Sequence, residues 1–273
     1  IIKRLSSNPS EERAATFWDS RERIETPDGD WFYADTKYGS EPDCPKVLLL
    51  HGLEANSHSR NSMELAQAFY NVGMTCVCLN FRGCTGEPNE NFSGYHLGFT
   101  DDLHHYLKLM AEREETNKPV YLSGFSMGAN VVLKCLGELG ARAADYNIQG
   151  ASVMGPPLDQ NRNAVVLAQP GVNRLIYTQN LLQKLKDRTK ERVDSKLNGN
   201  YDTDFFDFHG CMKAETITEF DDAFHRGVNG FADCWDYYTQ TSSIFYLDNI
   251  ATPTLLLGRS EERRVGKECR SRW

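Results

Sequence analysis

The residues best suited to chemistry lie in the pentapeptide Gly124-Phe125-Ser126-Met127-Gly128, which fits the pattern G-x-S-x-G. A short apolar run precedes the pentapeptide, and a run with helical periodicity follows it. In that context the pattern is typical of a serine nucleophile on a sharp strand-to-helix turn, where small flanking residues let both elements approach. The start of the helix also favours negative charge that develops beside the serine. The sequence therefore predicts that Ser126 is the nucleophile of an acyl-transfer reaction.

Two other interpretations of this serine are an ordinary strand–helix turn and a turn that binds phosphate. A phosphate-binding turn commonly carries a lysine at the P-loop position or the pattern G-x-G-x-x-G. Neither feature occurs in the sequence, and this favours the nucleophile.

A second tripeptide, His51-Gly52-Leu53, agrees with this interpretation because it directly follows the apolar run 46–50. An oxyanion hole needs one backbone N–H from such a loop and one from the residue after the nucleophile. We therefore expect the N–H groups of Leu53 and Met127 to be the donors. His51 is expected to hold the loop through hydrogen bonds of its ring rather than to act as a base.

A serine nucleophile also needs a base and an acid, and the sequence offers poor candidates for both. Only His209 and His225 follow Ser126, and both fall in a region of helical signals. Asp159, after the fourth strand-like run, is the fallback acid. Three other histidines are expected to be structural or solvated, namely His96, His104 and His105. The pairs Asp101-Asp102 and Asp221-Asp222 are expected to be charges at helix starts.

Strand-like and helix-like runs alternate along the first part of the chain. Strands are expected at 46–50, 75–80, 118–122 and 148–154, and helices at 61–72, from Thr100 to about 115, and at 127–139. A hairpin is expected at 21–36, with Asp28-Gly29 at its turn. This order predicts an α/β fold with a mostly parallel sheet covered by helices on both faces.

The chain divides into five segments by pattern. An N-terminal extension at 1–20 precedes the first part of the core at 21–159. Helical signals without strands follow at 160–248, with helices expected at 172–193 and 214–225. Such an insertion predicts a cap over an active site. The sheet resumes at 254–257 within a last core segment, 249–258.

The fifth segment, 259–273, reads RSEERRVGKECRSRW and breaks the pattern. It holds six Lys or Arg and three Glu, with Val265 as its only aliphatic side chain. Read back through the genetic code, most of it matches the in-frame translation of a sequencing adapter that begins AGATCGGAAGAGC. We expect a non-native tail here. A genuine basic tail is the alternative.

Composition narrows the classes of function and the compartment. The 273 residues carry a net charge of −8, which argues against a nucleic-acid partner. No run of 18 apolar residues occurs, so no membrane span is expected; because the first residue is Ile1, a missing N-terminal anchor stays open. The eight cysteines are scattered, which predicts neither a metal site nor a disulfide framework. A reducing compartment, cytoplasmic or at a membrane, is expected.

Several longer motifs occur along the chain: HGLEANSHS at 51–59, NFRGCTGEPN at 80–89, YHLGFTDDL at 95–103, GFSMGAN at 124–130, EFDDAF at 219–224, GFADCWDYY at 230–238 and TPTLLL at 252–257. Together they resemble one family of α/β-hydrolases, the YheT-like esterases and lipases, and the resemblance covers 21–257. One departure is Ala55-Asn56, where related chains commonly carry another glycine. The resemblance implies that the triad aspartate follows 254–257 and the triad histidine lies one strand later, both past Gly258.

The expected function is hydrolysis of carboxylic esters, short- or medium-chain or lipid, through an acyl-enzyme on Ser126 and without a cofactor. Because the triad base is missing, we expect this chain to be a poor catalyst. Because its last strand would present an unpaired, apolar edge, we also expect poor expression. The alternatives are a non-catalytic binding protein of this fold and an acyltransferase that uses an alcohol as acceptor. The oligomeric state stays open.

Overall fold

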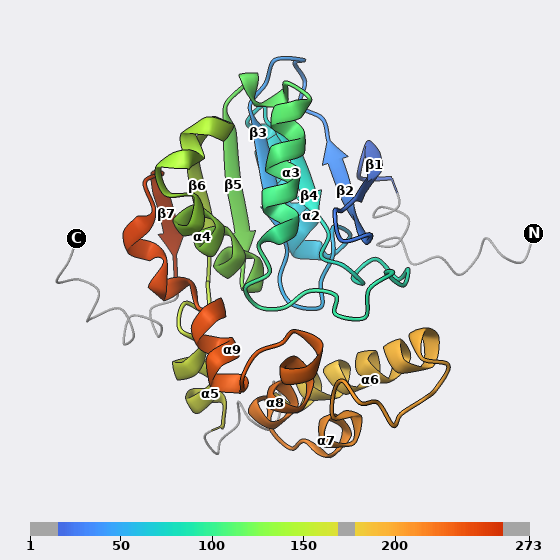
Figure 1. Cartoon of the computed structure of the whole chain (residues 1–273). Helices are drawn as coiled ribbons and strands as arrows, with labels where there is room; N and C mark the ends of the chain where they lie inside the picture. Colours follow the sequence, from blue (N-terminus) through green and yellow to red (C-terminus); the bar gives the residue numbers. More distant parts are fainter. Residues whose placement is uncertain (1–15, 169–177, 259–273) are drawn as a thin grey trace, which may run out of the picture.

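The computed structural model describes residues 16–168 and 178–258 (Figure 1). Within these ranges, seven strands form one sheet in the order β1-β2-β4-β3-β5-β6-β7. The strands β1 and β2 form the antiparallel hairpin, β2 pairs antiparallel with β4, and all other pairs are parallel. Their bounds are β1 Ser20–Glu25, β2 Trp31–Lys37, β3 Lys46–Leu50, β4 Thr75–Leu79, β5 Val120–Phe125, β6 Ile148–Met154 and β7 Thr254–Leu257.

The predicted hairpin and parallel strands are confirmed, with one difference at β5. This strand begins two residues later than expected and continues to Phe125. Ser123 and Gly124 are polar or small, so hydrophobicity did not mark this end of β5 as strand. Ser123 and Gly124 nevertheless pair with β3 on one side and with β6 on the other. Two neighbouring ladders therefore extend β5 up to Ser126.

Helices cover both faces of the sheet, because side chains along the central strands alternate between the faces. Leu48 and Leu50 of β3 pack in the large core with residues of α3 (Asp101–Glu112) and α4 (Met127–Leu139). Val47 and Leu49 face the other way, toward α2 (Arg60–Asn71). Short 3₁₀ turns complete this part at η2 Glu115–Asn117, η3 Gly140–Tyr146, η5 Ser243–Phe245 and η6 Leu247–Asn249.

The expected buried cysteines are confirmed. Cys76, Cys78 and Cys135 have no exposed surface, and the seven cysteines among the described residues are all free thiols. They act here as small core side chains.

Segment 160–248 is helical where it is described, and its helices lie together beneath the sheet in the view of Figure 1. They are α5 Gln160–Ala168, α6 Gln179–Lys196, α7 Phe208–Lys213, α8 Ile217–Val228 and α9 Cys234–Thr241. The segment has a small core of its own, built mainly from aromatic rings: Phe206, Phe208, Phe220 and Phe224. Part of the predicted helix 172–193 lies outside the described residues.

The predicted helix at 214–225 is confirmed as α8, which begins and ends three residues later than expected, at Ile217 and Val228. The hydroxyl of Thr216 accepts a hydrogen bond from the N–H of Glu219 at 3.1 Å. This N-cap fixes the start of the helix, which helical periodicity alone did not locate.

Strand β7 lies at the edge of the described sheet, where it pairs with β6. Leu255, Leu256 and Leu257 are 57%, 42% and 47% exposed. An apolar edge strand was expected at this position. In the described parts of the chain, no helix has the length and apolar character needed to cross a bilayer.

Two glycines allow α4 to meet the ends of the strands at very short range. A Cβ added to Gly128 would lie 2.3 Å from the carbonyl oxygen of Leu50 and 2.5 Å from that of His51. A Cβ on Gly124 would lie 2.6 Å from the backbone of Gly128. The nearest atoms at both positions belong to the backbone, so a side chain at either position would have to move the helix.

We predict that Gly128→Ala destabilises the fold by about 3 kcal/mol, because the new methyl group collides with backbone that cannot rotate away. Urea unfolding of both proteins measures this difference. Gly150→Ala is the matched control, since its Cβ would meet the nearest atom at 3.4 Å, and less than about 1 kcal/mol is expected. Equal stabilities of the two variants would contradict the close packing described above.

Candidate active site

Ser126 connects β5 to α4 in a strained backbone conformation, with φ 53° and ψ −123°. Its N–H donates to the carbonyl of Met154 at 2.8 Å, and its own carbonyl accepts from the N–H of Asn130 at 3.2 Å. The side chain itself is exposed. Strain of this kind persists only when the surroundings enforce it, and it is common at reactive residues.

The loop after β3 lies directly against this serine. A Cβ added to Gly52 would be 3.4 Å from the Cβ of Ser126. In the described residues, the N–H of Leu53 donates to no protein group. Met127 is the first residue of α4, where N–H groups lack an intrahelical acceptor. Two unengaged N–H groups thus flank the serine, both on residues that line the same cavity.

His51 fixes this loop through both ring nitrogens, as the sequence predicted. Nε2 accepts a hydrogen bond from the N–H of Phe81 at 3.0 Å, so Nδ1 carries the proton and donates to the carbonyl of Gly52 at 2.9 Å. Complete burial lowers the pKa of His51 to about 4. The ring is therefore neutral at physiological pH and serves as a rigid connection between two loops.

Glu54 ties the same loop to two other parts of the molecule, which sequence reasoning missed. Its backbone has a φ of 56°, unusual for a glutamate. Its carboxylate accepts from the hydroxyl of Tyr95 at 2.8 Å and pairs with Nε of Arg188, on α6, at 2.6 Å. The chain separations are long, so no local pattern could have found these partners.

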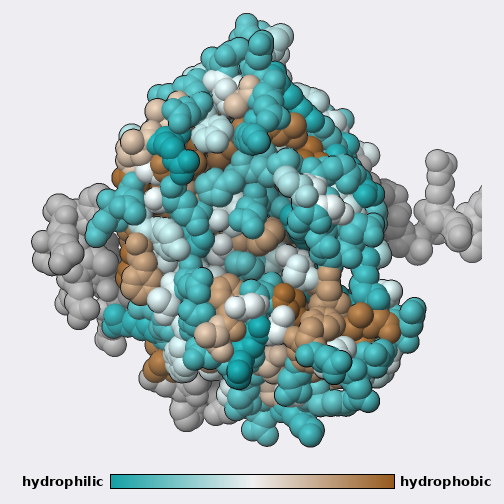
Figure 2. Space-filling model, in the orientation of Figure 1, coloured by the Kyte–Doolittle hydropathy of each residue, from teal (hydrophilic) through white to brown (hydrophobic). Residues whose placement is uncertain are grey.

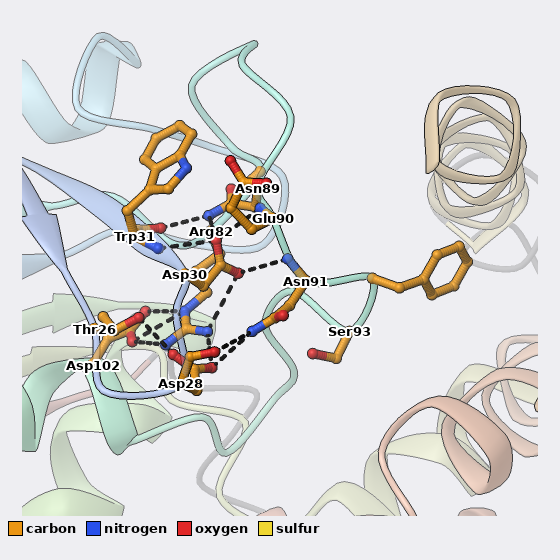
Figure 3. A network of polar contacts seen from close by, with 12 residues as sticks. Thr26, Asp28, Asp30, Trp31, Arg82, Asn89, Glu90, Asn91, Ser93 and Asp102 are labelled. Carbon is orange, nitrogen blue, oxygen red and sulfur yellow. Dashed lines mark hydrogen bonds and ion pairs between the residues drawn. The ribbon is translucent and has the colours of Figure 1, made fainter. Parts of the chain in front are cut away.

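The loop that carries Tyr95 is anchored by a buried arginine, Arg82, shown in Figure 3. Its guanidinium contacts Asp28 at 2.6 Å, Asp30 at 3.4 Å and Asp102 at 2.6 Å. Asn89 adds a hydrogen bond to Asp30 at 2.8 Å. The network therefore joins the β1–β2 turn, the loop after β4 and the start of α3.

The expected charges at the start of α3 are confirmed, since Asp101 and Asp102 lie in its first turn. The side chain of Thr100, the residue before the helix, makes no capping hydrogen bond. Asp102 is also buried and pairs with Arg82, which gives the arginine a counter-charge below the protein surface.

A cavity of about 1030 Å³ opens above Ser126, between the ends of the strands and the helical segment 160–248. Its walls are largely apolar, with Leu185, Phe220, Phe224 and Ile244 among the lining residues. Figure 2 shows apolar side chains gathered on this face where the sheet meets the helices beneath it. A volume of this order holds a lipid-sized or drug-sized molecule. In the described residues, no group of His, Cys, Asp and Glu is arranged to bind a metal ion.

Comparisons with known proteins place the chain in a family. The model of the family described as "Serine aminopeptidase, S33" matches residues 41–232. The Escherichia coli protein YheT is 31% identical over 245 residues, which make up 88% of this chain and 68% of YheT. The chain belongs to the YheT-like family of α/β-hydrolases.

Two further likenesses agree with this assignment. "Medium-chain fatty acid ethyl ester synthase/esterase 2" of Saccharomyces cerevisiae is 29% identical to the YheT-like chain, over 84% of this chain and 53% of the yeast protein. The chain therefore spans about half the length of that relative. A solved esterase from Pyrococcus furiosus, 13% identical, shares the fold with a TM-score of 0.50 over 98% of this chain and 95% of the esterase. The predicted α/β-hydrolase fold and esterase/lipase-type family are thus confirmed.

None of the histidines of this YheT-like chain forms a hydrogen bond with the Ser126 hydroxyl in the described structure. His209 is exposed and pairs with Asp202 at 3.1 Å. His104 contacts Glu138 at 2.8 Å, and Nε2 of His105 donates to the carbonyl of Glu25, at the end of β1, at 2.9 Å.

Two of the other candidates line the cavity. Asp159 does so, but one of its carboxylate oxygens accepts the N–H of Arg162 at 3.0 Å and so begins α5. His96 packs edge-on against Phe99, and burial lowers the pKa of its ring to about 4. Both side chains have structural contacts that account for their positions.

The pair Asp221-Asp222 lies inside α8 rather than at its start, so the expected helix-start role is wrong. Asp221 is buried in the cavity wall and accepts from the hydroxyl of Tyr238 at 2.6 Å. His225, one turn further on, approaches it at 3.7 Å. Burial raises the pKa of Asp221 to about 7 and keeps His225 neutral by lowering its pKa. A protonated acid therefore faces the cavity below neutral pH.

This raised pKa predicts a specific dependence of stability on pH. Between its ordinary value of 3.8 and about 7, Asp221 keeps a proton in the folded chain that the unfolded chain has lost. The stability that this proton gives to the folded chain is fully present below pH 3.8 and is lost as pH rises through 7. We expect Asp221→Asn, which resembles the protonated acid, to gain up to about 4 kcal/mol over the wild type between pH 4 and pH 8.

Urea unfolding of the wild type and Asp221→Asn at several pH values measures this gain. His51 and His96 titrate in both proteins, so their opposite contribution cancels in the difference. A difference in stability that stays constant from pH 4 to pH 8 would sink the prediction.

Proposed function

We propose that the protein hydrolyses carboxylic esters through an acyl-enzyme on Ser126. The observation that carries the proposal is the strained, exposed Ser126 at the base of a large apolar cavity, with the Leu53 loop against it. The Ser126 hydroxyl attacks the ester carbonyl, the alcohol leaves, and water then releases the acid. The N–H groups of Leu53 and Met127 donate to the oxyanion that forms in each step.

The base and the acid of the proposed triad come from residues past Gly258, in accordance with the family resemblance. Asp159 is the fallback acid within the chain. Because no described histidine bonds to Ser126, we propose that the 273-residue chain alone turns esters over slowly. Loss of a triad base lowers kcat by about 10⁴-fold or more in enzymes of this type.

We propose that segment 160–248 is the cap over this site, since α5, α6, α8 and α9 all contribute to the cavity wall. For the rest of the chain we propose the same segments as from the sequence, namely 1–20, 21–159, 249–258 and 259–273. The substrate is a small-molecule ester whose acyl chain fits the apolar walls, of short or medium length or from a lipid. Free, buried cysteines support a location that faces a reducing compartment.

A second candidate reaction is acyl transfer to an alcohol. The name of the yeast relative, an ethyl ester synthase as well as an esterase, favours it. The same serine and oxyanion donors carry out both reactions, and the acceptor decides the product. Adding ethanol to a medium-chain acyl donor and measuring ethyl ester against free acid separates the two reactions. A non-catalytic binding protein would form neither product.

The nucleophile itself is tested by labelling the full-length protein with a fluorophosphonate probe. We expect Ser126→Ala to abolish labelling and to lower the hydrolysis of p-nitrophenyl butyrate by about 10³-fold or more. Ser123→Ala is the matched control, because this serine lies three residues earlier on β5, is buried, and bonds to Ser152. Labelling that survives in Ser126→Ala but not in Ser123→Ala would refute the proposal.

A further inference from the structure

One face of α6 lines the cavity with residues that change in character along the helix. They are Leu181, Leu185, Arg188, Thr189 and Arg192, at spacings of three and four that bring them to the same side. The face is apolar toward the start of α6 and basic toward its end. The basic end lies beside Glu54 and Tyr95, next to the loop of Leu53.

The charge of Arg188 is already balanced. Its Nε pairs with the carboxylate of Glu54 at 2.6 Å, and Nη1 donates to the carbonyl of Gly83 at 2.7 Å. Glu54 in turn accepts from the hydroxyl of Tyr95. This arginine therefore serves mainly to hold the loop after β3 against α6.

Arg192, one turn further along, has no such partner. Among the described residues, no carboxylate lies within 4.0 Å of its guanidinium. Nη1 donates to two neutral carbonyls, of Ser93 at 3.3 Å and Phe92 at 3.5 Å. These long hydrogen bonds orient the guanidinium without neutralising it.

Gly94 makes room for this guanidinium. A Cβ at Gly94 would lie 2.7 Å from Nη2 of Arg192, and the backbone there has a φ of 63°. Burial also lowers the pKa of Arg192, although arginine stays charged in proteins. A fixed, uncompensated cation in a cavity wall is unfavourable unless an anion joins it.

The nearby acids do not supply that anion. Glu54 is engaged with Arg188 and Tyr95, and Asp221 bonds to the hydroxyl of Tyr238. The remaining lining of this region is apolar, with Leu185, Phe220 and Phe224. The cavity thus combines one unbalanced positive charge with walls suited to an aliphatic chain.

We propose that Arg192 binds an anionic group of the substrate, a carboxylate or a phosphate, while the aliphatic part of the ester lies along the apolar walls. This inference rests on the proposed ester hydrolysis and specifies its substrate class as amphiphilic esters with a negative charge. Guanidinium groups favour both anions because two N–H donors can bind two oxygens.

Matched pairs of esters test the inference on the full-length protein. One pair is p-nitrophenyl pentanoate and the mono-p-nitrophenyl ester of glutarate, which differ in the terminal carboxylate. The other pair is 1-decanoylglycerol and its 3-phosphate. We expect Arg192→Gln to lower kcat/KM for the charged member of at least one pair by about tenfold or more, with the neutral members within about threefold. The pair with the larger loss identifies the anion.

Two control variants separate charge recognition from structure. Lys190→Gln removes the same charge from an exposed position on α6 and should change neither ester. Arg192→Lys keeps the charge and should recover part of the lost activity. Thermal unfolding of each variant verifies that it folds. Equal losses for charged and neutral esters, or none for either, would overturn the inference while leaving ester hydrolysis standing.

A binding measurement keeps the two proposals distinguishable if no ester is hydrolysed. Titration calorimetry with dodecyl phosphate, which has no ester carbonyl, reports anion binding alone. We expect the Kd to rise by about tenfold or more in Arg192→Gln and to stay unchanged in Lys190→Gln. An unchanged Kd in Arg192→Gln would reject the anion site whatever the fate of the hydrolase proposal.

Discussion

The close approach of α4 to the ends of β3 and β5 is the constraint on which the rest of the site depends. Gly124 and Gly128 bring the backbones together at distances that no side chain permits. The chain can turn from strand to helix in so little space only if Ser126 adopts a positive φ. The turn leaves the hydroxyl exposed, puts the first N–H groups of the helix beside it, and leaves room for the loop that follows β3.

That loop is held from three directions, and each connection crosses a long stretch of chain. His51 fixes it to the loop after β4, while Glu54 joins it to Tyr95 and to α6. The loop that carries Tyr95 depends in turn on the buried charges around Arg82 (Figure 3). A shift of α6 would therefore act on the N–H of Leu53 through Arg188 and Glu54, so the helical segment can influence the proposed oxyanion hole without contacting the serine.

Local patterns were sufficient to predict the strands, the hairpin turn, the helix after Ser126 and the role of His51. Each of these follows from hydrophobic periodicity or from a short motif with a fixed geometry. The pairs Arg82–Asp102 and Glu54–Arg188 could not be predicted, because their partners meet only after the chain has folded. The same reason explains Asp221, whose spacing resembled a helix start although burial against Tyr238 decides its chemistry. The end of β5 was missed because pairing with two neighbours, rather than side-chain character, makes it a strand.

The most direct test of the account is a crystal structure of the full-length protein after reaction with a fluorophosphonate. The account predicts a phosphorus–oxygen bond to Ser126, with the phosphoryl oxygen about 2.7–3.1 Å from the backbone nitrogens of both Leu53 and Met127. An adduct on another residue would contradict it. So would a phosphoryl oxygen on Ser126 that points away from these two N–H groups, because the nucleophile and its oxyanion donors would then not form one site.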